Sequence, residues 1–397
     1  MVVMTLQVIP AFIVLLLSFP PVDSAALNCT MSSVAVNRNQ QCAIVCQTPP
    51  ADGGRVLLKI FNSSDSNIFR TVVVNNQFTG AGQNPEVIID GRGIVTVAWE
   101  QSGDSRILVI VSRFDSTGRP LGDPITLMDQ GSLANQTPRV ALGNDGRFVV
   151  VWSGLGKGII GQRFSKNGKK VGPMFQAVHK KTQNAQYPSV KMDKQNRIGI
   201  VWQDGSIDDF RIILRMFDWN LKPTRAVQVD QAMGLAYFSN PDLLFLRNGN
   251  TVVAWKDYRT GEANVYQQIL NSALTPIGKN RRVNDDSGKQ WQRLPKLASF
   301  DGSNYAMVWE DYRNDDNNQI ADVYVQQFAM NGSNISSNRK IEVLREPTAQ
   351  RFPAAAMKPD GDLIVTWSDS RWDTSTIYMV EVNSENREKK PESQVFP

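Results

Sequence analysis

Apolar residues occur along this chain in short runs that recur at a nearly constant interval. The clearest runs end in tryptophan, as in FVVVW at 148–152. The six tryptophans in this position are Trp99, Trp152, Trp202, Trp255, Trp309 and Trp367, with gaps of 53, 50, 53, 54 and 58 residues. A proline stands 14 residues before each of them, at Pro85, Pro138, Pro188, Pro241, Pro295 and Pro353. A constant offset found six times indicates one structural unit used repeatedly.

Each unit has the pattern of four short strands. The first follows the proline, as at 139–142, and ends at a turn such as Asp145-Gly146. Asp-Gly and Asn-Gly predict two-residue hairpins, in which both central residues have positive φ. The second strand is apolar throughout, which indicates that both of its faces are covered. The third tends to alternate, as in NVYQQIL at 264–270, and the fourth is shorter.

This pattern predicts an all-β fold, a seven-bladed β-propeller of four-stranded antiparallel blades. Counting 53 residues back from Trp99 reaches Cys46, at the end of the run 43–46, which supplies a degenerate seventh unit. A solenoid or paired sandwiches also repeat strands, but the turn followed by a buried strand favours the propeller. We assign 1–26 to a signal peptide, 27–385 to the propeller and 386–397 to a C-terminal tail.

The apolar segment 8–17, followed by small residues, predicts a secretory signal peptide cleaved after Ala26. A bacterial lipoprotein anchored at Cys29 is the alternative, although Leu27 and Asn28 fit poorly before a lipidated cysteine. The mature chain is expected to be secreted and monomeric, without a membrane span. Its Asn-x-Ser/Thr triplets predict glycosylation at Asn28, Asn62, Asn331 and Asn334.

The cysteines and the charge narrow the possibilities further. Cys42 and Cys46 lie too far apart along one strand to bridge each other. Of the pairings that remain for Cys29, we prefer a Cys29–Cys46 disulfide, with Cys42 buried and unpaired. The single histidine, His179, is far from the cysteines and disfavours a zinc site. The net charge of +5 comes from scattered basic residues, which argues against nucleic acid as a partner.

The sequence QRFPAAAMKPDGDLIVTWSDSR at 350–371 closely matches QRLPKLASFDGSNYAMVWEDYR at 292–313. Such units resemble the repeats of exported seven-bladed propeller proteins with the pattern P-x-V-A-x-x-x-D-G-x-x-V-V-V-W-x-D-x-R. The resemblance covers the mature chain and implies the fold and export. It implies no ligand, because members of this group differ in function. Arg293-Leu294-Pro295 and Arg351-Phe352-Pro353 are also similar to the Arg-Ile-Pro element of sialidases, whose arginine binds the substrate carboxylate. The chain lacks the S-x-D-x-G-x-x-W box of sialidases.

Loops that enter the first strand and leave the second converge at one face of a propeller, the usual ligand site. The positions before the prolines are rich in amides and arginines, which bind hydroxyls and carboxylates. An aromatic side chain nearby offers a surface for a sugar ring. The predicted ligand-binding residues are Gln136, Gln186, Trp291, Gln292, Arg293, Gln350 and Arg351. The alternative is that these side chains tie the loops of neighbouring blades together.

Three further sets of charged residues have a structural and a functional interpretation. The positions after the prolines carry Glu86, Arg139, Asp242 and Lys296, for which we expect ion pairs between blades rather than acid–base chemistry. The Asp-x-Arg triplets are expected to lock the turn after the second strand; the alternative is an arginine cluster of Arg259, Arg313 and Arg371 for an acidic ligand. A calcium site is the functional interpretation of Asp311, Asp315, Asp316 and Asp322, a solvated acidic loop the structural one. No other cofactor is predicted.

The sequence therefore predicts a secreted recognition protein that binds a glycan or another extracellular protein on its loop-rich face. The alternatives are an enzyme acting on extracellular polysaccharide, a hydrolase or lyase of sialidase-like kind, and a structural role. The single histidine disfavours lyases and metal-dependent hydrolases, which commonly use this residue. No catalytic residue is predicted.

Overall fold

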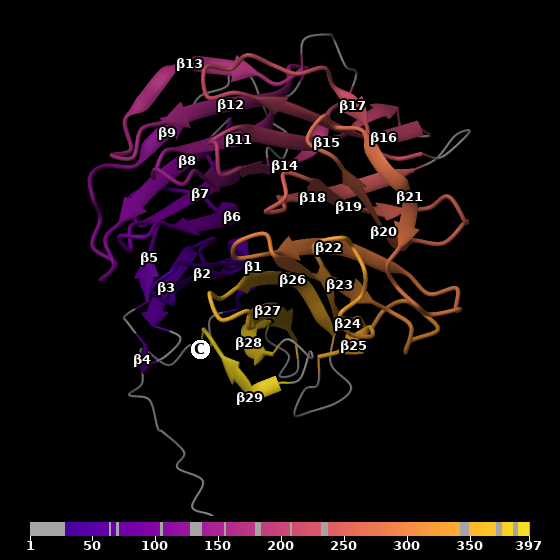
Figure 1. The fold of residues 1–397 in the computed structure, drawn as a ribbon. Helices are drawn as coiled ribbons and strands as arrows, with labels where there is room; N and C mark the ends of the chain where they lie inside the picture. The colour runs from indigo at the N-terminus through magenta and orange to yellow at the C-terminus, as the bar shows by residue number, and fades with distance from the viewer. Residues whose placement is uncertain are drawn as a thin grey trace, which may run out of the picture.

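The computed structural model describes residues 28–396, except 63–64, 69–70, 104–105, 128–136, 155, 179–183, 207–208, 232–236, 342–348, 371–374 and 384–387. Six sheets have four strands and the first has five; all pairings are antiparallel, and all join consecutive strands except that of β3 with β5 in the first sheet. The sheets follow one another around a ring (Figure 1). The predicted seven-bladed propeller is confirmed. The predicted signal peptide, Gln136, His179 and Arg371 lie outside the described residues.

The blades are named A to G in chain order, and each begins with its innermost strand. The strands of blades A to C are β1 (Thr30–Val36), β2 (Gln41–Gln47), β3 (Val56–Asn62), β4 (Asp65–Ile68) and β5 (Val72–Val73); β6 (Gly82–Ile89), β7 (Val95–Ser102), β8 (Ile107–Phe114) and β9 (Ile125–Leu127); β10 (Arg139–Leu142), β11 (Phe148–Gly154), β12 (Gly158–Phe164) and β13 (Lys170–Gln176).

The remaining strands form blades D to G. They are β14 (Gln186–Met192), β15 (Ile198–Ser206), β16 (Asp209–Phe217) and β17 (Val227–Gln228); β18 (Phe238–Phe245), β19 (Thr251–Asp257), β20 (Asn264–Leu270) and β21 (Pro276–Arg282); β22 (Gln292–Ala298), β23 (Asn304–Asp311), β24 (Asp322–Ala329) and β25 (Arg339–Lys340); β26 (Gln350–Met357), β27 (Leu363–Asp369), β28 (Thr376–Val382) and β29 (Glu388–Gln394).

The hairpin turns differ from the prediction. Gly146 and Gly361 have φ of 83° and 89°, whereas the preceding Asp145 and Asp360 are not left-handed. The N–H of Gly146 donates to the carbonyl of Gly143, which makes a type I turn that ends in a left-handed glycine. The two-residue hairpin was therefore wrong, because only the glycine of each Asp-Gly pair adopts positive φ. The flanking strands still pair in antiparallel fashion, and the apolar second strand is buried as predicted.

The Asp-x-Arg triplets lock the end of the second strand, as predicted. In blade F, the indole Nε1 of Trp309 donates to Asp311 (2.9 Å), and the N–H of Arg313 donates to the same carboxylate (2.9 Å). The Arg313 guanidinium pairs with Asp311 at 2.7 Å and lies 4.2 Å from the ring centroid of Tyr324.

Blade E repeats this arrangement with Trp255, Asp257, Arg259 and Tyr266. In both blades the tryptophan is completely buried, and the tyrosine ring lies beside it in the third strand. These two arginines are therefore part of the scaffold.

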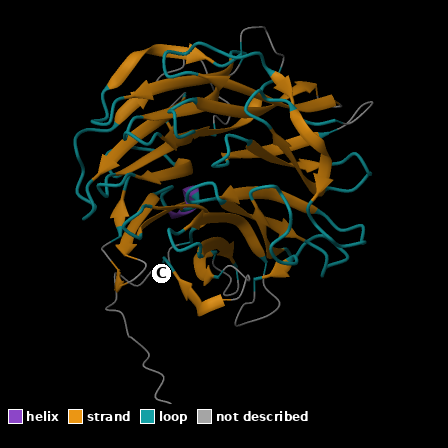
Figure 2. Cartoon of the chain, in the orientation of Figure 1, coloured by secondary structure: helices purple, strands orange, loops and turns teal. Residues whose placement is uncertain are grey.

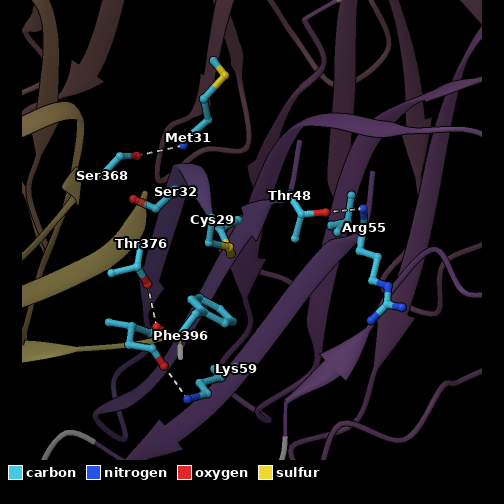
Figure 3. Close-up of a disulfide and its surroundings, with 12 residues drawn as sticks. Cys29, Met31, Ser32, Thr48, Arg55, Lys59, Ser368, Thr376 and Phe396 are labelled. Atoms are coloured by element: carbon cyan, nitrogen blue, oxygen red, sulfur yellow. Dashed lines mark hydrogen bonds between the residues drawn. A yellow bond between two sulfur atoms is a disulfide. The ribbon is translucent and has the colours of Figure 1, made fainter. Parts of the chain in front are cut away.

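The ring closes where blade A meets blade G. Cys46 occupies the tryptophan position of blade A and forms the predicted disulfide with Cys29, while Cys42 is buried and unpaired. The N–H of Cys29 donates to the carbonyl of Ser375 (2.5 Å), and the N–H of Met31 donates to Ser368 Oγ (3.0 Å; Figure 3). Backbone and side-chain hydrogen bonds thus join the first blade to the last.

The end of the chain contributes to this closure. Phe396 is fully buried in a cluster with Cys29, Cys42 and Ile377, and its carbonyl accepts a hydrogen bond from Thr376 Oγ1 at 2.6 Å (Figure 3). Strand β29 pairs with β28. The assignment of 386–397 to a tail is therefore corrected, because residues 388–394 form the outermost strand of blade G.

Loops and strands make up nearly all of the described chain, and the single helical turn is Pro50–Asp52 (Figure 2). No helix long and apolar enough to cross a membrane occurs among the described residues.

Candidate functional site

Every blade has a strained residue where its innermost strand begins. Met31, Asn84, Thr137, Tyr187, Asn240, Leu294 and Phe352 have φ between 43° and 55°. All but Met31 precede a proline, a position that normally favours extended backbone. In blades A, B, D, E, F and G the strand register also shifts at this point, as at a β-bulge. Such strain needs support from neighbouring groups and concentrates at functional sites. We call this end of the ring the entry face.

The support comes from the preceding blade. The residue directly after the tryptophan position is here called the latch residue. In blades A, B, F and G it accepts a hydrogen bond from the strained N–H of the next blade, whereas the side-chain oxygens of Ser153 in blade C and Gln203 in blade D have no hydrogen-bond partner among the described residues. The acceptor atom is Gln47 Oε1 for Asn84 (2.6 Å), Glu100 Oε1 for Thr137 (2.5 Å), Glu310 Oε1 for Phe352 (2.7 Å) and Ser368 Oγ for Met31 (3.0 Å). A negative charge is not required for this bond, because the neutral side chains of Gln47 and Ser368 also accept it.

The latch residue of blade F, Glu310, has further polar contacts besides the hydrogen bond with the next blade. Glu310 is only 2 % exposed, yet its Oε2 lies 3.2 Å from Arg293 Nε and accepts a hydrogen bond from the Tyr312 hydroxyl at 3.2 Å. Arg293 in turn donates to the Tyr312 oxygen. Burial raises the pKa of Glu310, although the Phe352 N–H and the charge of Arg293 oppose this shift. A buried carboxylate, a tyrosine and an arginine thus form one connected group at the entry face.

The latch residue of blade E is a cation, unlike those of the other six blades. It is Lys256, whose ammonium group cannot accept a hydrogen bond from Leu294. Its Nζ lies 5.2 Å from the ring centroid of Tyr258 and 5.8 Å from that of Tyr237, within cation–π range. Burial, with a smaller contribution from Arg293, lowers the pKa of Lys256 to about 8.

Aromatic side chains complete the arrangement. The guanidinium of Arg293 lies 4.5 Å from the ring centroid of Tyr312 and 5.5 Å from that of Trp291, which is half-buried. Together, Lys256, Tyr258, Trp291, Arg293, Glu310 and Tyr312 are called the Glu310 cluster. It combines anionic, cationic and aromatic groups across blades E and F.

The predicted ligand-binding residues separate into two groups. Arg293 lies in the Glu310 cluster, and Arg351, which is exposed and donates to the Gln319 carbonyl at 2.7 Å, lies close enough to lower the pKa of Glu310. Trp291 lies beside Arg293. Gln186 is in blade D, remote from them along the chain, and donates to Asn184.

The contacts of Gln292 and Gln350 fit the alternative interpretation, in which these side chains join neighbouring blades. Both are completely buried. Gln292 Oε1 accepts from Asn284 Nδ2 of blade E at 2.8 Å, and Gln350 Oε1 accepts from the N–H of Val323 of blade F at 2.7 Å. These contacts give both amides a role in joining blades. Their part in ligand binding, like that of the other predicted residues, stays a prediction.

The carboxylates of the acidic loop do not converge. Asp311 pairs with Arg313, and Asp322 lies 3.1 Å from Lys340. Asp315 accepts the N–H groups of its own loop, and Asp316 accepts from Gln290. In the part of the chain that the structure describes, no group of three or more His, Cys, Asp or Glu side chains is placed to hold a metal ion. Calcium binding by this loop stays a prediction, to which this geometry adds no support.

The glycosylation predictions fall on different environments. Asn331 and Asn334 are exposed in a turn of blade F. Asn28 donates to Asp52 at 2.8 Å, and Asn62 is half-buried in β3. Attachment at Asn331 or Asn334 would disturb the fold least, and all four sites stay predictions.

Sequence reasoning missed Glu310, Tyr312, Lys256 and Tyr258 as members of one site. A signal was present: the residue after each tryptophan is an acceptor in every blade except E, where it is Lys256. The role of that position became apparent only from the contact with the following blade.

Comparisons with known proteins show similarity of fold alone. No protein-family model matches the sequence, and no curated protein matches it. A protein of unknown function from Dyadobacter fermentans is 11 % identical, with a TM-score of 0.52, over 86 % of this chain and 91 % of that one. The N10 neuraminidase-like protein of A/little yellow-shouldered bat/Guatemala/060/2010 is 9 % identical, with a TM-score of 0.50, over 80 % and 96 %.

A prolyl endopeptidase structure is 12 % identical, with a TM-score of 0.57, over 94 % of this chain; the match covers half of that protein's length. The propeller and a weak structural similarity to neuraminidase-like proteins are therefore shown, while the repeat family suggested by the sequence is not confirmed.

Proposed function

We propose that this protein is a secreted recognition protein that binds a glycan at the Glu310 cluster on its entry face. The observation that carries the proposal is the latch of blade F. A neutral acceptor performs the same scaffold role at Gln47, whereas Glu310 is additionally joined to Arg293 and Tyr312. These three polar groups, which the scaffold does not require, belong to the same cluster as Trp291 and Tyr258.

The cluster has the groups that sugar recognition requires. Aromatic faces pack against the apolar side of a sugar ring, while arginine and lysine donate to its oxygens. Arg293 and Lys256 are held in place by aromatic rings, which reduces the conformational entropy lost on binding. Export is part of the proposal: the Cys29–Cys46 disulfide is compatible with an oxidising, extracellular compartment.

A glycan array tests this proposal. Wild-type protein is expected to bind a defined set of glycans, and Arg293→Ala is expected to reduce that binding at least tenfold. Arg247→Ala is the matched control, because this side chain is 65 % exposed in the first turn of blade E, at the opposite end of the strands. Thermal unfolding of each variant separates loss of binding from loss of folding. Absence of binding by folded wild-type protein, or equal losses in both variants, would reject a glycan site here.

The same array, repeated with EDTA, tests the calcium prediction. Loss of binding on chelation that calcium restores would support metal binding by the 311–322 segment. Unchanged binding would remove calcium from the recognition mechanism and leave the Glu310 cluster as its basis.

A catalytic version of the proposal is favoured by one observation. Burial raises the pKa of Glu310, so this carboxyl retains its proton to higher pH than an exposed one and could serve as a proton donor to a glycosidic oxygen. A polysaccharide hydrolase or lyase would release new reducing ends from a glycan found on the array. Loss of that release in Glu310→Gln, measured at a glycan concentration that saturates the variant, would establish catalysis; no release by the wild type would restrict the function to recognition.

A further inference from the structure

A second group of charged side chains surrounds the axis of the propeller, apart from the Glu310 cluster. The residue two positions after the strained residue lies on the innermost strand of each blade, and these strands surround the axis (Figure 1). Blades B, C, E and F place Glu86, Arg139, Asp242 and Lys296 there. Ser189 of blade D donates to Asp242 at 2.6 Å across the blade boundary. Lys191 follows two residues later on the same side of β14.

The two carboxylates of this group are already engaged. Asp242 accepts from Ser189 Oγ with one oxygen and from the N–H of Leu297 with the other, at 2.6 and 2.8 Å. Glu86 Oε2 lies 3.9 Å from Arg139 Nη1, as expected for an ion pair between blades. The predicted second pair, between Asp242 and Lys296, does not form a direct contact among the described residues.

The cations are not compensated to the same extent. Arg139, Lys191 and Lys296 face only two carboxylates. Within the described chain, neither Lys191 nor Lys296 has a hydrogen bond or ion pair through its ammonium group, although both are half-buried. Placing charge in such a confined region without a counter-charge is costly.

We propose that Arg139, Lys191 and Lys296 bind a small inorganic anion of halide or phosphate size on the axis of the propeller. The three cations come from blades C, D and F, so the anion would hold together strands that have no direct contact through these side chains. Their partial exposure leaves room for solvent exchange at this position.

The electrostatics agree with this placement. The pKa of Lys296 is lowered by burial first, and then by Arg139 and Lys191, while Asp242 and Glu86 act in the opposite direction. These are the charged groups that face Lys296, and the cations among them are near enough to repel it. A bound anion would attract all three and would oppose the lowering of the pKa of Lys296.

Thermal unfolding in sodium bromide, sodium phosphate and sodium gluconate at equal ionic strength tests the proposal. Gluconate serves as the reference because it is too bulky for a small-anion site. Bromide or phosphate is expected to raise the Tm of the wild type in proportion to the logarithm of its concentration. Lys296→Met is expected to lose this increment. Lys194→Met, which removes an exposed lysine in the turn after β14, is expected to retain it.

A response to bromide alone identifies a halide site, and a response to phosphate identifies an oxyanion site. Diffraction from bromide-soaked crystals should then show an anomalous peak between Arg139 and Lys296. If Lys296→Met does not fold, Lys191→Met provides the same comparison. Equal Tm values in all three salts would overturn the proposal. So would an increment that persists in the Lys296 and Lys191 variants, or a Lys296–Asp242 ion pair in place of the bromide peak.

Discussion

Blade F and blade A are versions of the same structural unit that are held together in different ways. In blade F, Trp309 fills the space between strands and is fixed by Asp311, Arg313 and Tyr324. In blade A, the tryptophan position is Cys46, and a disulfide to Cys29 takes the place of that network. Covalent closure and the buried Phe396 therefore supply, at the ring junction, what aromatic packing supplies elsewhere.

The latch residues of the two blades differ in a more informative way. Gln47 and Glu310 each accept the strained N–H of the next blade, at 2.6 and 2.7 Å. Gln47 shows that the scaffold requires only a neutral acceptor. Glu100 of blade B, a second carboxylate latch, receives the Asn84 amide and the Thr137 N–H. A carboxylate joined to Arg293 and Tyr312 is therefore a property of blade F and not of the repeat, which is why we place function there.

The largest expected effect is on the scaffold of blade F. Asp311→Ala leaves the Trp309 indole and the Arg313 guanidinium without their carboxylate in a buried environment, and should lower the free energy of unfolding by about 4 kcal/mol. Urea denaturation measures this change. Asp316→Ala, in the exposed part of the same segment, should change it by less than about 0.5 kcal/mol. A loss for Asp311→Ala no greater than that for Asp316→Ala would show that the network does not stabilise blade F.

The corresponding change in blade A should be somewhat smaller. The Cys29–Cys46 disulfide has a sequence separation of 17 residues, and a loop of this length stabilises a fold by about 3 kcal/mol through the unfolded chain. Replacing both cysteines by serine should shift the urea midpoint accordingly. Dithiothreitol should destabilise the wild type and leave the double variant unchanged. Insensitivity of the wild type to complete reduction would show that packing around Phe396 closes the ring without the covalent bond.

The sequence contains most of what determines the fold in local, periodic signals. The constant distance from proline to tryptophan reports a strand, a turn and a buried strand in six blades. The interval of 53 residues located blade A, where Cys46 replaces tryptophan. Strand geometry excludes a Cys42–Cys46 bridge, and of the two pairings left for Cys29 the preferred one, with Cys46, is confirmed. These inferences depend on the spacing of residues within one unit, and such spacing is preserved in the folded blade.

The candidate site depends on contacts between units, which spacing within one unit does not report. Arg293 could be predicted as a ligand-binding candidate, but its neighbours Glu310 and Tyr312 are defined by how β22 pairs with β23 and how Phe352 reaches the preceding blade. Gln292 looked equivalent to Arg293 in sequence, yet strand alternation buries it completely. The left-handed residues before the prolines were also missed, because that position normally favours extended backbone.

The comparison of latch residues can be tested by giving blade F the amide that blade A has at this position. Glu310→Gln keeps an oxygen for the Phe352 N–H and removes the charge next to Arg293, so the free energy of unfolding should change by about 1 kcal/mol or less. Glycan affinity should fall about tenfold, since a hydrogen bond to a charged group contributes about 1.5 kcal/mol or more. Isothermal titration calorimetry with a glycan identified on the array measures the loss. The control is Glu100→Gln, the same substitution at the latch of blade B, which should leave affinity unchanged. Equal losses in the two variants would mean that both carboxylates act through the scaffold.

The smallest expected effect concerns Lys256, the latch that cannot accept a hydrogen bond. Its pKa is about 8 in the folded protein, below its ordinary value of 10.5. Between these two pH values the unfolded chain binds one more proton than the folded one, so the stability contributed by this site rises as pH rises. Over one pH unit centred on 8, the gain is at most about 0.7 kcal/mol, and solvent screening of the half-buried amine reduces it.

Urea denaturation across this range should therefore show a steeper rise of stability with pH in the wild type than in Lys256→Met. The other groups that titrate there, such as Lys59 and Lys296, are present in both proteins and cancel in the comparison. Parallel pH profiles would show that Lys256 titrates as an exposed lysine. The entry face of blade E would then differ from that of blade A only by the absence of an acceptor, and the case for a cation held ready for a ligand would rest on Arg293 alone.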